Sequence, residues 1–327
     1  MTTRLTIVMP VFNDWESFRC LLTDLAACLS ERDCTVAIVA VDDCSGERAP
    51  ATLELASPII GATVLRLSAN MGHQRAIAVG LASIAARHDI DLVAVMDSDG
   101  EDRPDELVRL IDSATTHPKL AIMAQRAKRS EGLGFRLLYQ IYTQAFRLLT
   151  GQRIDFGNFC LLPFEYLERL VNRPDIWNNF AATMIRARIP LARVPTTRGL
   201  RYAGESRMSF SSLVAHGLGA MSVFSEIIFI RILFGSGLLL VMVTVGAFAV
   251  LGVRMFSDLA IPGWTTNVFG FLLVIGFQTI MTAVMMAFLV LNNRASVQVA
   301  PSNVAGGYVR EIQSFAGPGT NGKAVDS

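Results

Sequence analysis

Two long uncharged apolar segments limit what this chain can fold into. Residues 232–253 and 268–291 contain no charged side chain, and a short loop with Arg254 and Trp264 separates them. As helices rising about 1.5 Å per residue, segments of this length are roughly 33–36 Å long, which is enough to cross a bilayer. The alternative is a pair of buried core helices, but uncharged runs longer than about 18 residues favour membrane spans.

Positive charges lie on one side of this predicted hairpin. Arg201, Arg207 and Arg231 precede the first apolar segment and Arg294 follows the second, whereas the connecting loop is nearly neutral. Because basic flanking segments stay in the cytoplasm, we predict a multi-pass protein of the inner (cytoplasmic) membrane. Its large N-terminal part is then cytoplasmic, and membrane lipid is one of its partners.

The chain divides into four expected parts. Residues 1–207 form an N-terminal domain, and residues 231–292 form the two transmembrane helices. Between them, residues 208–230 place apolar side chains among Ser, Gly and Ala, which is typical of a helix lying at the bilayer interface. This segment can alternatively pack on the N-terminal domain. Residues 293–327 are expected to be a flexible cytoplasmic tail.

The N-terminal domain alternates strand and helix patterns. Apolar runs rich in branched residues end in polar turns at 5–12, 36–43, 63–68 and 92–97, with helical stretches at 15–29, 75–87 and 105–114. This alternation predicts an α/β fold with a mostly parallel sheet covered on both faces. In such sheets ligands bind beyond the carboxyl ends of the strands. The pairs Asn13–Asp14, Asp42–Asp43 and Asp97–Asp99 fall at three such ends.

Four carboxylates crowd into the turn that follows the apolar run at 92–97. Asp97, Asp99, Glu101 and Asp102 lie within six positions of the sequence VAVMDSDGED. Like charges this close repel one another, so a partner has to neutralise them. A D-x-D pair at a strand end suits Mg²⁺ or Mn²⁺, with substrate phosphates completing the ligand shell. A solvated acidic turn is the alternative.

Several other functional classes lack support in the sequence. The formal net charge is only +1, so nothing indicates nucleic-acid binding. The five cysteines are scattered without a C-x-x-C pair, as expected for reduced thiols. The run GPGTNGKA (317–324) resembles a phosphate-binding loop, but it lacks the required Ser or Thr and the flanking strand and helix.

An ordered series of motifs carries a family resemblance. The runs MPVFND, VDDCS, NMGHQRAIAVGL and DSDGEDRPDEL resemble the successive signatures of family 2 glycosyltransferases with the GT-A fold. RYAGESRMSF, followed by an amphipathic segment and two spans, resembles the polyprenyl-phosphate glycosyltransferases, such as dolichyl-phosphate mannose synthase and bactoprenol glucosyltransferase. The resemblance implies inverting transfer of a sugar from a nucleotide sugar to a polyprenyl phosphate. It also implies that the chain forms a homo-oligomer, with a tetramer as the expected form.

The resemblance also implies roles for individual residues. Pro10, Phe12, Asp14 and Asp42 would hold the base and ribose, and Asp97 would contact both nucleotide and sugar. The metal site comprises Asp99 and Glu101, with Glu101 standing where relatives usually have Gln. The residues expected to take part in catalysis are Asp97, Asp99, Arg136 and Arg207.

The acceptor side is basic. Cationic side chains gather before an apolar helical run at 125–151 and suit an anionic lipid head group, which Arg grips through two parallel hydrogen bonds. By resemblance, the lipid phosphate is bound by Arg126, Arg136, Arg201 and Arg207. Two departures lie at Asn158 and Cys160, which replace an expected Asp and Arg. Asp155 is a candidate for the missing carboxylate, although a lipid phosphate is already an anion and needs no general base.

Four other functions fit the sequence less well. A processive polysaccharide synthase requires a Q-x-x-R-W motif, but none of the three tryptophans follows an arginine. A transporter is disfavoured because the two spans contain no charge. A transferase that elongates a glycan or glycolipid, and a catalytically weak scaffold with the same fold, remain the alternatives.

Overall fold

The computed structural model describes most of the chain, in five stretches: 2–126, 133–203, 210–256, 263–296 and 298–318. Contacts divide it into two compact units. The first, called here the α/β unit, comprises Met1–Arg136, Ile154–Val223 and Val299–Ser327. The second, called the helical unit, comprises Leu137–Arg153 and Phe224–Gln298.

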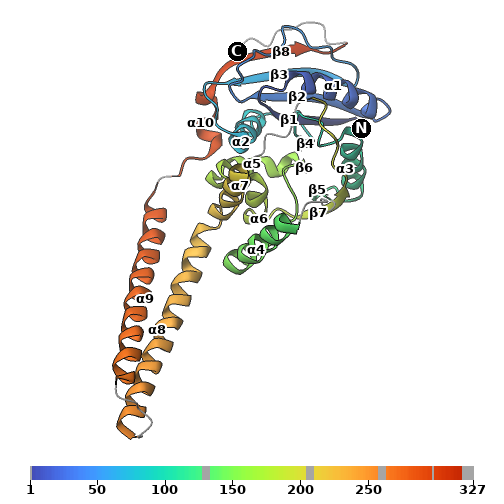
Figure 1. The fold of residues 1–327 in the computed structure, drawn as a ribbon. Coiled ribbons are helices and arrows are strands. Elements are labelled where there is room, and N and C mark those ends of the chain that lie inside the picture. Colours follow the sequence, from blue (N-terminus) through green and yellow to red (C-terminus); the bar gives the residue numbers. More distant parts are fainter. Residues whose placement is uncertain (1, 127–132, 204–209, 257–262, 297, 319–327) are drawn as a thin grey trace. The chain divides into compact units, whose positions relative to one another are not determined.

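The α/β unit is built on one eight-stranded sheet (Figure 1) with the strand order β7-β5-β6-β4-β1-β2-β3-β8. Strands β4, β1, β2 and β3 are mutually parallel, and β5 is parallel to β7. Only β6 and β8 pair with their neighbours in the antiparallel sense. The strands are β1 (Thr3–Val11), β2 (Cys34–Asp42), β3 (Ile59–Leu67), β4 (Leu92–Val95), β5 (Ala121–Arg126), β6 (Cys160–Pro163), β7 (Leu191–Thr196) and β8 (Val309–Ala316).

Helices cover both faces of this sheet, as the continuous apolar strand runs require. In β1, Val8 belongs to the hydrophobic cluster under α2, whereas Ile7 and Met9 belong to the cluster under α1 and α3. The helices of this unit are α1 (Trp15–Leu29), α2 (His73–Ile84), α3 (Pro104–Thr116), α5 (Leu167–Val171), α6 (Phe180–Arg186), α7 (Phe210–Ser222) and α10 (Pro301–Tyr308), with short 3₁₀ turns at Phe164–Tyr166 and Pro174–Trp177. The predicted alternation of strand and helix is confirmed.

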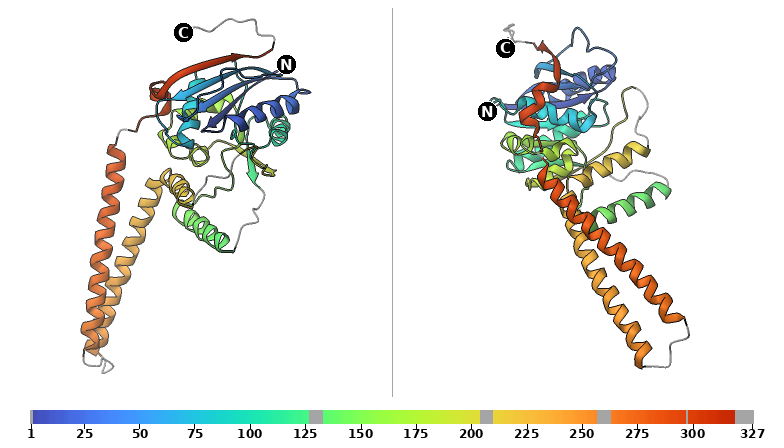
Figure 2. Two further views of the ribbon diagram at one scale, coloured as in Figure 1. Left: turned by 45° about the horizontal axis from the view of Figure 1, so that its top comes forward. Right: turned by 90° about the vertical axis from the view of Figure 1, so that its left-hand side faces the viewer.

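The C-terminal segment corrects one expectation. We expected a flexible tail over 293–327, but α9 continues to Ala295, and then α10 packs on α2 while β8 pairs with β3 from Gly61–Ala316 to Leu67–Val309. Figure 2 shows β8 beside β3 at one edge of the sheet. The run VREIQSFA alternates polar and apolar side chains, which is the period of a strand. Residues 319–327 lie outside the described part of the chain.

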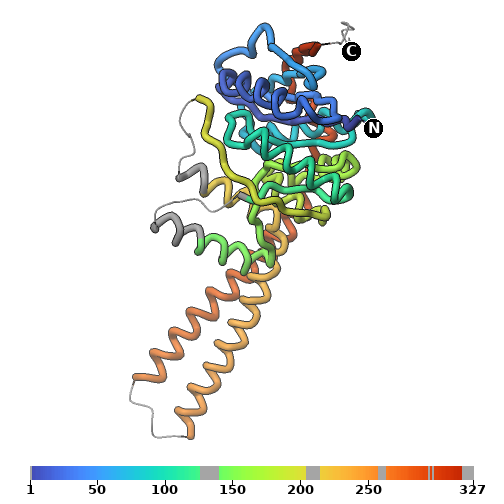
Figure 3. Tube along the Cα trace, turned by 90° about the vertical axis from the view of Figure 1, so that its right-hand side faces the viewer, coloured from blue at the N-terminus to red at the C-terminus, as the bar shows by residue number. Residues whose placement is uncertain are grey.

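The helical unit consists largely of two long antiparallel helices, α8 (Ser225–Phe256) and α9 (Trp264–Ala295), which run side by side (Figure 3). Glycines lie where they approach: Gly246 faces Leu272, and Gly276 faces Val243. Small residues let transmembrane helices pack closely. Most of α4 (Leu133–Thr150) belongs to the same unit.

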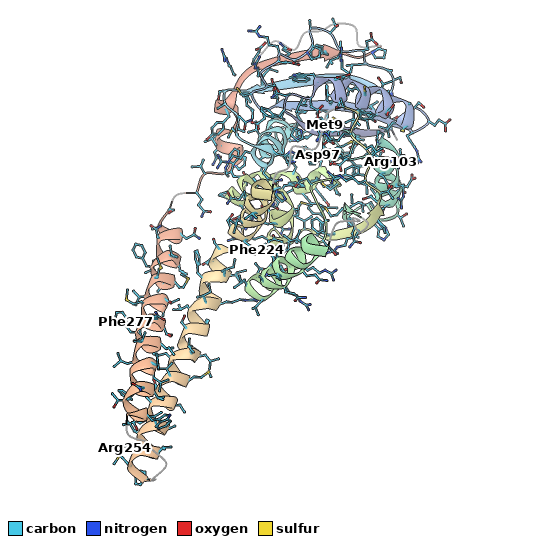
Figure 4. All side chains as sticks on the ribbon, in the orientation of Figure 1. Met9, Asp97, Arg103, Phe224, Arg254 and Phe277 are labelled. Carbon is cyan, nitrogen blue, oxygen red and sulfur yellow. The ribbon has the colours of Figure 1, made fainter. Side chains whose placement is uncertain are left out.

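Both long helices expose their apolar side chains. Only 6% of the most apolar window in α8 and 11% of that in α9 is buried. Phe277, labelled in Figure 4, is 63% exposed. A soluble core helix would bury these residues, so their exposure favours membrane spans over a pair of core helices. By length and composition both helices can cross a membrane.

The segment expected at the interface is divided between two helices. Helix α7 ends at Ser222, and residues from Ser225 onwards already belong to α8. Near its C-terminal end α7 packs on α6, with Gly219 close to the carbonyl of Asn178, whereas Val214 and Leu218 remain exposed. Part of α7 therefore packs on α6 within the α/β unit, and part presents an apolar surface.

The fit of α2 against the sheet generates a stability prediction. A Cβ at Gly80 would lie 2.5 Å from a methyl carbon of Val8 and 2.7 Å from one of Val41. Overpacking of this kind costs about 1–3 kcal/mol, so Gly80→Ala should lower the free energy of unfolding by that amount. The measurement is denaturant unfolding of the detergent-solubilised chain, followed by the fluorescence of the packed Trp15 and Trp177. Gly306→Ala is the matched control because a Cβ at Gly306 meets nothing within 4 Å. Equal stability of the two variants would contradict the packing.

Candidate functional site

The carboxyl ends of β1, β2 and β4 lie next to one another, because these strands are neighbours in the sheet. The loops that follow them therefore meet at one edge, as the sequence predicts. Figure 4 labels Asp97, which follows β4 at this edge. The predicted convergence of the three acidic or amide pairs is confirmed at the level of sheet topology.

The loops after β1 and β2 are tied together by hydrogen bonds. Asn13 adopts a left-handed backbone conformation with φ +52°, which Asn tolerates better than most residues. Its backbone N–H donates to the Ser45 hydroxyl at 2.8 Å, and its side-chain oxygen accepts from the Gly46 N–H at 2.8 Å. This turn fixes the position of Asp14, which immediately precedes α1.

Asp42 is fully buried at the end of β2, where an ionised carboxylate needs partners. Its Oδ1 accepts from the Ser45 N–H at 2.9 Å, and its Oδ2 lies 3.6 Å from Nε of Arg66 on β3. Arg66 also donates to the Ser45 carbonyl. The sequence analysis missed Arg66, although a lone charge in the apolar run TVLRLS is a detectable signal.

Asp43 supports the loop before α2. The backbone N–H groups of Met71 and Gly72 donate to its two carboxylate oxygens at 2.6 and 2.8 Å. Burial raises the pKa of Asp43, and these two hydrogen bonds act in the opposite direction. Asp43 thus holds the start of α2, including His73, against the sheet.

Hydrogen bonds within the turn after β4 stabilise two of its carboxylates. The Asp97 N–H donates to the buried carboxylate of Asp102 at 3.0 Å, and the Glu101 N–H donates to Asp99 at 2.9 Å. The Ser98 hydroxyl donates to the Pro10 carbonyl at 2.9 Å, which ties the turn to β1. Gly100 has φ +88°, and a Cβ there would lie 2.4 Å from the ring of Tyr202.

A segment after β7, Thr197–Tyr202, lies against this turn and is called here the covering segment. Its central contact is made by Arg201, whose guanidinium bridges Asp14 at 2.7 Å and Asp99 at 3.0 Å. Arg198 pairs with Glu101. The guanidinium of Arg201 thus brings carboxylates from two different strand ends onto one cation.

Further bonds hold the covering segment in place. The Gly199 N–H donates to the Glu101 carbonyl at 2.9 Å, and the Tyr202 N–H donates to the Asp99 carbonyl at 3.1 Å. The Tyr202 hydroxyl donates to Asp24 on α1. Burial, and then this hydrogen bond, raise the pKa of Tyr202. Tyr202 therefore stays a neutral donor at physiological pH.

A polar cluster lies on the other side of Asp97, where α2 begins and β6 approaches β4. Asp97 Oδ1 is 3.3 Å from His73 Nε2, and Asn158 Nδ2 is 3.0 Å from the same nitrogen. Gln74 Nε2 donates to Asn158 Oδ1 at 3.2 Å. The sequence analysis assigned no role to His73 or Gln74, because only the tertiary structure brings them to the carboxylates.

The remaining expected residues are distributed as follows. Phe12 is exposed at the end of β1, and Asp155 pairs with Arg193 and Gln125 rather than with the carboxylate turn. Cys160 is fully buried, and burial raises the pKa of its thiol to about 12, so it cannot take over the role of the expected Arg. Arg207 and the side chains of Arg126 and Arg136 lie outside the described residues.

Asp14 and Asp99 lie close enough to share one divalent cation, but they provide only two of the ligands that such a cation needs. The guanidinium of Arg201 shows that the two carboxylates share a cationic partner. Among the described residues no group of three or more acidic, His or Cys ligands gathers. Mg²⁺ is usually held by one or two carboxylates together with substrate phosphates, so such a cation would need a phosphate-bearing ligand. The expected metal ligand Glu101 is paired with Arg198, as Asp99 is paired with Arg201.

Comparison with known proteins gives consistent findings. The family model described as Glycosyl transferase family 2 matches residues 6–176, more than half of the chain. An undecaprenyl-phosphate 4-deoxy-4-formamido-L-arabinose transferase of Sodalis glossinidius (strain morsitans) is 25% identical over 224 residues, which cover 64% of each protein. The transferase of the same name from Pseudomonas aeruginosa (strain LESB58) is 29% identical over 160 residues, covering 48% of this chain and 45% of that protein. The chain thus spans less than two thirds of the length of these relatives.

Solved structures give a weaker likeness. Glucosyl-3-phosphoglycerate synthase from Mycobacterium tuberculosis in complex with Mn²⁺, UDP-glucose and phosphoglyceric acid is 14% identical, with a TM-score of 0.47 over 69% of this chain and 80% of that one. The complex of the synthase with Mg²⁺ and UDP has a TM-score of 0.46 over 69% of this chain and 79% of that one.

The bridging position of Arg201 generates a prediction about cation binding. Arg201→Ala removes a guanidinium that competes for Asp14 and Asp99, so Mn²⁺ should bind more tightly. A charge-assisted hydrogen bond contributes about 1.5–3 kcal/mol, which corresponds to a change of roughly tenfold or more. The measurement is isothermal titration with Mn²⁺ in the presence of a saturating nucleoside diphosphate, which supplies the phosphate ligands. Arg4→Ala is the matched control, because Arg4 pairs with Asp91 on an exposed surface. An unchanged affinity in Arg201→Ala would show that the guanidinium and the metal do not share these oxygens.

Proposed function

Because the chain belongs to glycosyltransferase family 2, we propose that it transfers a sugar from a nucleotide sugar to a membrane polyprenyl phosphate, such as undecaprenyl or dolichyl phosphate. The product is a lipid-linked monosaccharide for the synthesis or modification of cell-envelope glycans. The observation that carries the proposal is the convergence of Asp14 and Asp99 on one cationic group, the guanidinium of Arg201, at the edge of the sheet. The same chain contains two helices long and apolar enough to cross a membrane.

The donor would bind along the carboxyl edge of the sheet. Pro10, Phe12 and Asp42 lie at the ends of β1 and β2, where a base and ribose would find an exposed ring and a buried carboxylate. Mg²⁺ or Mn²⁺ would be held by Asp99 and Glu101, with Asp14 next to them and the diphosphate completing the shell. When bound, the metal stabilises the negative charge that develops on the leaving nucleoside diphosphate.

The acceptor needs no general base. A lipid phosphate is already an anion, so one of its oxygens can form the new bond to the sugar while the bond to the nucleoside diphosphate breaks. A single displacement of this kind inverts the configuration at the sugar carbon. Asn158, an amide that cannot accept a proton as a base at neutral pH, is compatible with this chemistry.

Arginines would bind the acceptor phosphate. Arg126, Arg136 and Arg207 are candidates through the sequence motifs in which they lie, and Arg201 joins them once it leaves Asp14 and Asp99. The names of the two transferases compared above support an undecaprenyl phosphate as acceptor.

The proposal includes an orientation in the inner membrane. The α/β unit lies in the cytoplasm, where nucleotide sugars are made, and α8 and α9 cross the bilayer. Protease added to sealed vesicles with the cytoplasmic face inside should spare residues 2–200 and reach only the loop between α8 and α9. Cleavage within residues 2–200 would show that the orientation in the membrane is the opposite one.

A transfer assay tests the function directly. Purified full-length protein, Mg²⁺ or Mn²⁺, a short polyprenyl phosphate and a panel of UDP-, GDP- and dTDP-linked sugars should yield a lipid-linked monosaccharide with one donor. Asp99→Ala should abolish transfer while the domain stays folded, because it removes an oxygen ligand in the turn after β4 rather than a residue of either hydrophobic cluster. Release of free sugar with no lipid-linked product would indicate a different acceptor. No turnover of any donor would favour a scaffold.

The acceptor arginines make a second prediction in the same assay. Arg207→Ala should raise the lipid concentration needed for half-maximal rate by about tenfold to a hundredfold, since each charge-assisted phosphate contact contributes roughly 1.5–3 kcal/mol. The donor curve should hardly move. If the donor curve moves and the lipid curve does not, Arg207 binds the diphosphate of the donor instead.

A further inference from the structure

Two guanidinium groups of the covering segment contact the same carboxylates that the proposed metal would use. Arg201 lies 2.7 Å from Asp14 and 3.0 Å from Asp99, and Arg198 pairs with Glu101. The side chains of Arg201, Asp14 and Asp99 are only 23%, 15% and 14% exposed, so water and salt screen these ion pairs less than pairs on an open surface. In this structure the covering segment itself supplies the counter-ions of the three carboxylates.

A divalent cation cannot share these carboxylates with the two guanidinium groups. Like charges within about 4–6 Å of each other repel, and a carboxylate oxygen that binds a metal has to give up its N–H donor. Two guanidinium groups carry the same total charge as one Mg²⁺ or Mn²⁺, so exchanging them for the metal leaves the charge beside the carboxylates unchanged. Binding of the metal at Asp99 and Glu101 therefore displaces Arg201 and Arg198.

The geometry of Arg201 favours such an exchange. Its two terminal nitrogens contact Asp14 and Asp99, but its Nε is buried and has no hydrogen-bond acceptor in the part of the chain that the structure describes. A buried donor without an acceptor destabilises the arrangement that buries it. When the side chain of Arg201 moves away, Nε can donate to water or to a phosphate oxygen, so this cost is removed.

The backbone of the covering segment is held independently of these ion pairs. The N–H and the hydroxyl of Thr197 donate to the buried Glu106 on α3 at 2.9 and 2.8 Å, and the Tyr202 hydroxyl donates to Asp24 on α1. Between these two anchors, the backbone at Gly199 lies so close to the turn after β4 that a Cβ there would be 2.4 Å from a carbonyl oxygen of that turn. The exchange therefore requires the arginine side chains to move while the backbone stays in place.

We propose that Arg198 and Arg201 are exchangeable counter-ions that link the two substrates. They neutralise the carboxylates before the donor binds, and they turn to the acceptor phosphate when the metal and the nucleotide bind. Arg198 is then a further ligand of the acceptor phosphate, whose charge of about −1.5 to −2 at neutral pH suits two guanidinium groups. The donor binds first and the acceptor second. This inference rests on the proposed function, because it takes the acceptor to be a polyprenyl phosphate.

An exchange of this kind makes binding of the acceptor depend on the donor. The apparent affinity for a phosphate is lowered by the fraction of molecules in which the arginines are released. Because a charge-assisted hydrogen bond corresponds to roughly tenfold or more in affinity, Mn²⁺ and nucleotide should tighten binding of a lipid phosphate by about that factor. By linkage, the lipid phosphate should tighten binding of Mn²⁺ and nucleotide equally.

Binding titrations without turnover test this coupling. Farnesyl phosphate is titrated into the full-length, detergent-solubilised protein, first alone and then with saturating Mn²⁺ and whichever of UDP, GDP and dTDP binds most tightly. The wild type should bind farnesyl phosphate at least about tenfold more tightly in the second condition. Farnesol, the matched probe without a phosphate, should bind equally in both conditions. Equal affinity for farnesyl phosphate in the two conditions would overturn the inference.

Variants that release the arginines give a test without any metal. Asp14→Asn weakens the hold on Arg201, and the side chain of Asp14 makes no capping hydrogen bond to α1 that the change would remove. Without Mn²⁺, this variant should bind farnesyl phosphate about threefold to tenfold more tightly than the wild type, the size expected for one net hydrogen bond. Glu101→Gln should have the same effect through Arg198. Unchanged metal-free binding in both variants would contradict the exchange.

The matched control breaks an ion pair at the opposite edge of the same two strands. Asp91 precedes β4 and lies 2.7 Å from Arg4 on β1. Asp91→Asn should leave both affinities for farnesyl phosphate as they are in the wild type. If it tightens metal-free binding as much as Asp14→Asn does, the effect is a general one of charge and the inference fails.

The double variant Arg198→Ala/Arg201→Ala removes the exchanging groups. It should bind farnesyl phosphate equally with and without Mn²⁺ and nucleotide. Coupling as large as in the wild type would show that the metal itself contacts the phosphate, and would overturn the inference. Thermal unfolding of each variant checks the fold, and if the double variant fails to fold, Asp14→Asn decides. Absence of any binding of farnesyl phosphate to the wild type in either condition would instead overturn the proposed function.

Discussion

Repulsion among carboxylates at one sheet edge is the constraint on which the rest of the site depends. Asp14, Asp97, Asp99 and Glu101 come from two neighbouring strand ends, and like charges this close destabilise the fold unless each finds a donor or a cation. Backbone N–H groups satisfy part of this requirement within the turn. The guanidinium groups of the covering segment pair with Asp14, Asp99 and Glu101. The turn and the covering segment therefore hold each other, although about a hundred residues separate them along the chain.

This mutual neutralisation links the site to the segment that follows it. A cation that binds between Asp14 and Asp99 uses the oxygens that Arg201 contacts, so the two compete for the same place. The covering segment runs directly into residues 204–209, which contain Arg207. Arg201, which contacts the carboxylates of the proposed donor site, and Arg207, a candidate residue of the acceptor site, thus lie close together in the sequence.

Local patterns predicted much of the fold and the general place of the site. Apolar runs, helix periodicity and polar strand ends located β1, β2, β4 and the first helices, and parallel pairing brought Asp14, Asp42 and Asp97 to one edge. The expected flexible tail was wrong because composition alone does not show that the alternating strand β8 has an open edge of β3 to pair with. Arg66, Tyr202 and His73 were not assigned for a similar reason. Their partners are distant in sequence, and side-chain identity gives no distance.

The sequence by itself determined the periodicities and the charges: two uncharged runs of membrane-spanning length, strands that alternate with helices, and carboxylates at the strand ends. These follow from composition and spacing, which act locally along the chain. Only the tertiary structure decided how those charges are paired, that Arg201 bridges Asp14 and Asp99, and that Gln74, Asn158 and His73 gather beside Asp97. Hydrogen bonds and ion pairs depend on distance and direction to within a few tenths of an ångström, and strand order, rather than any motif, sets which side chains come that close.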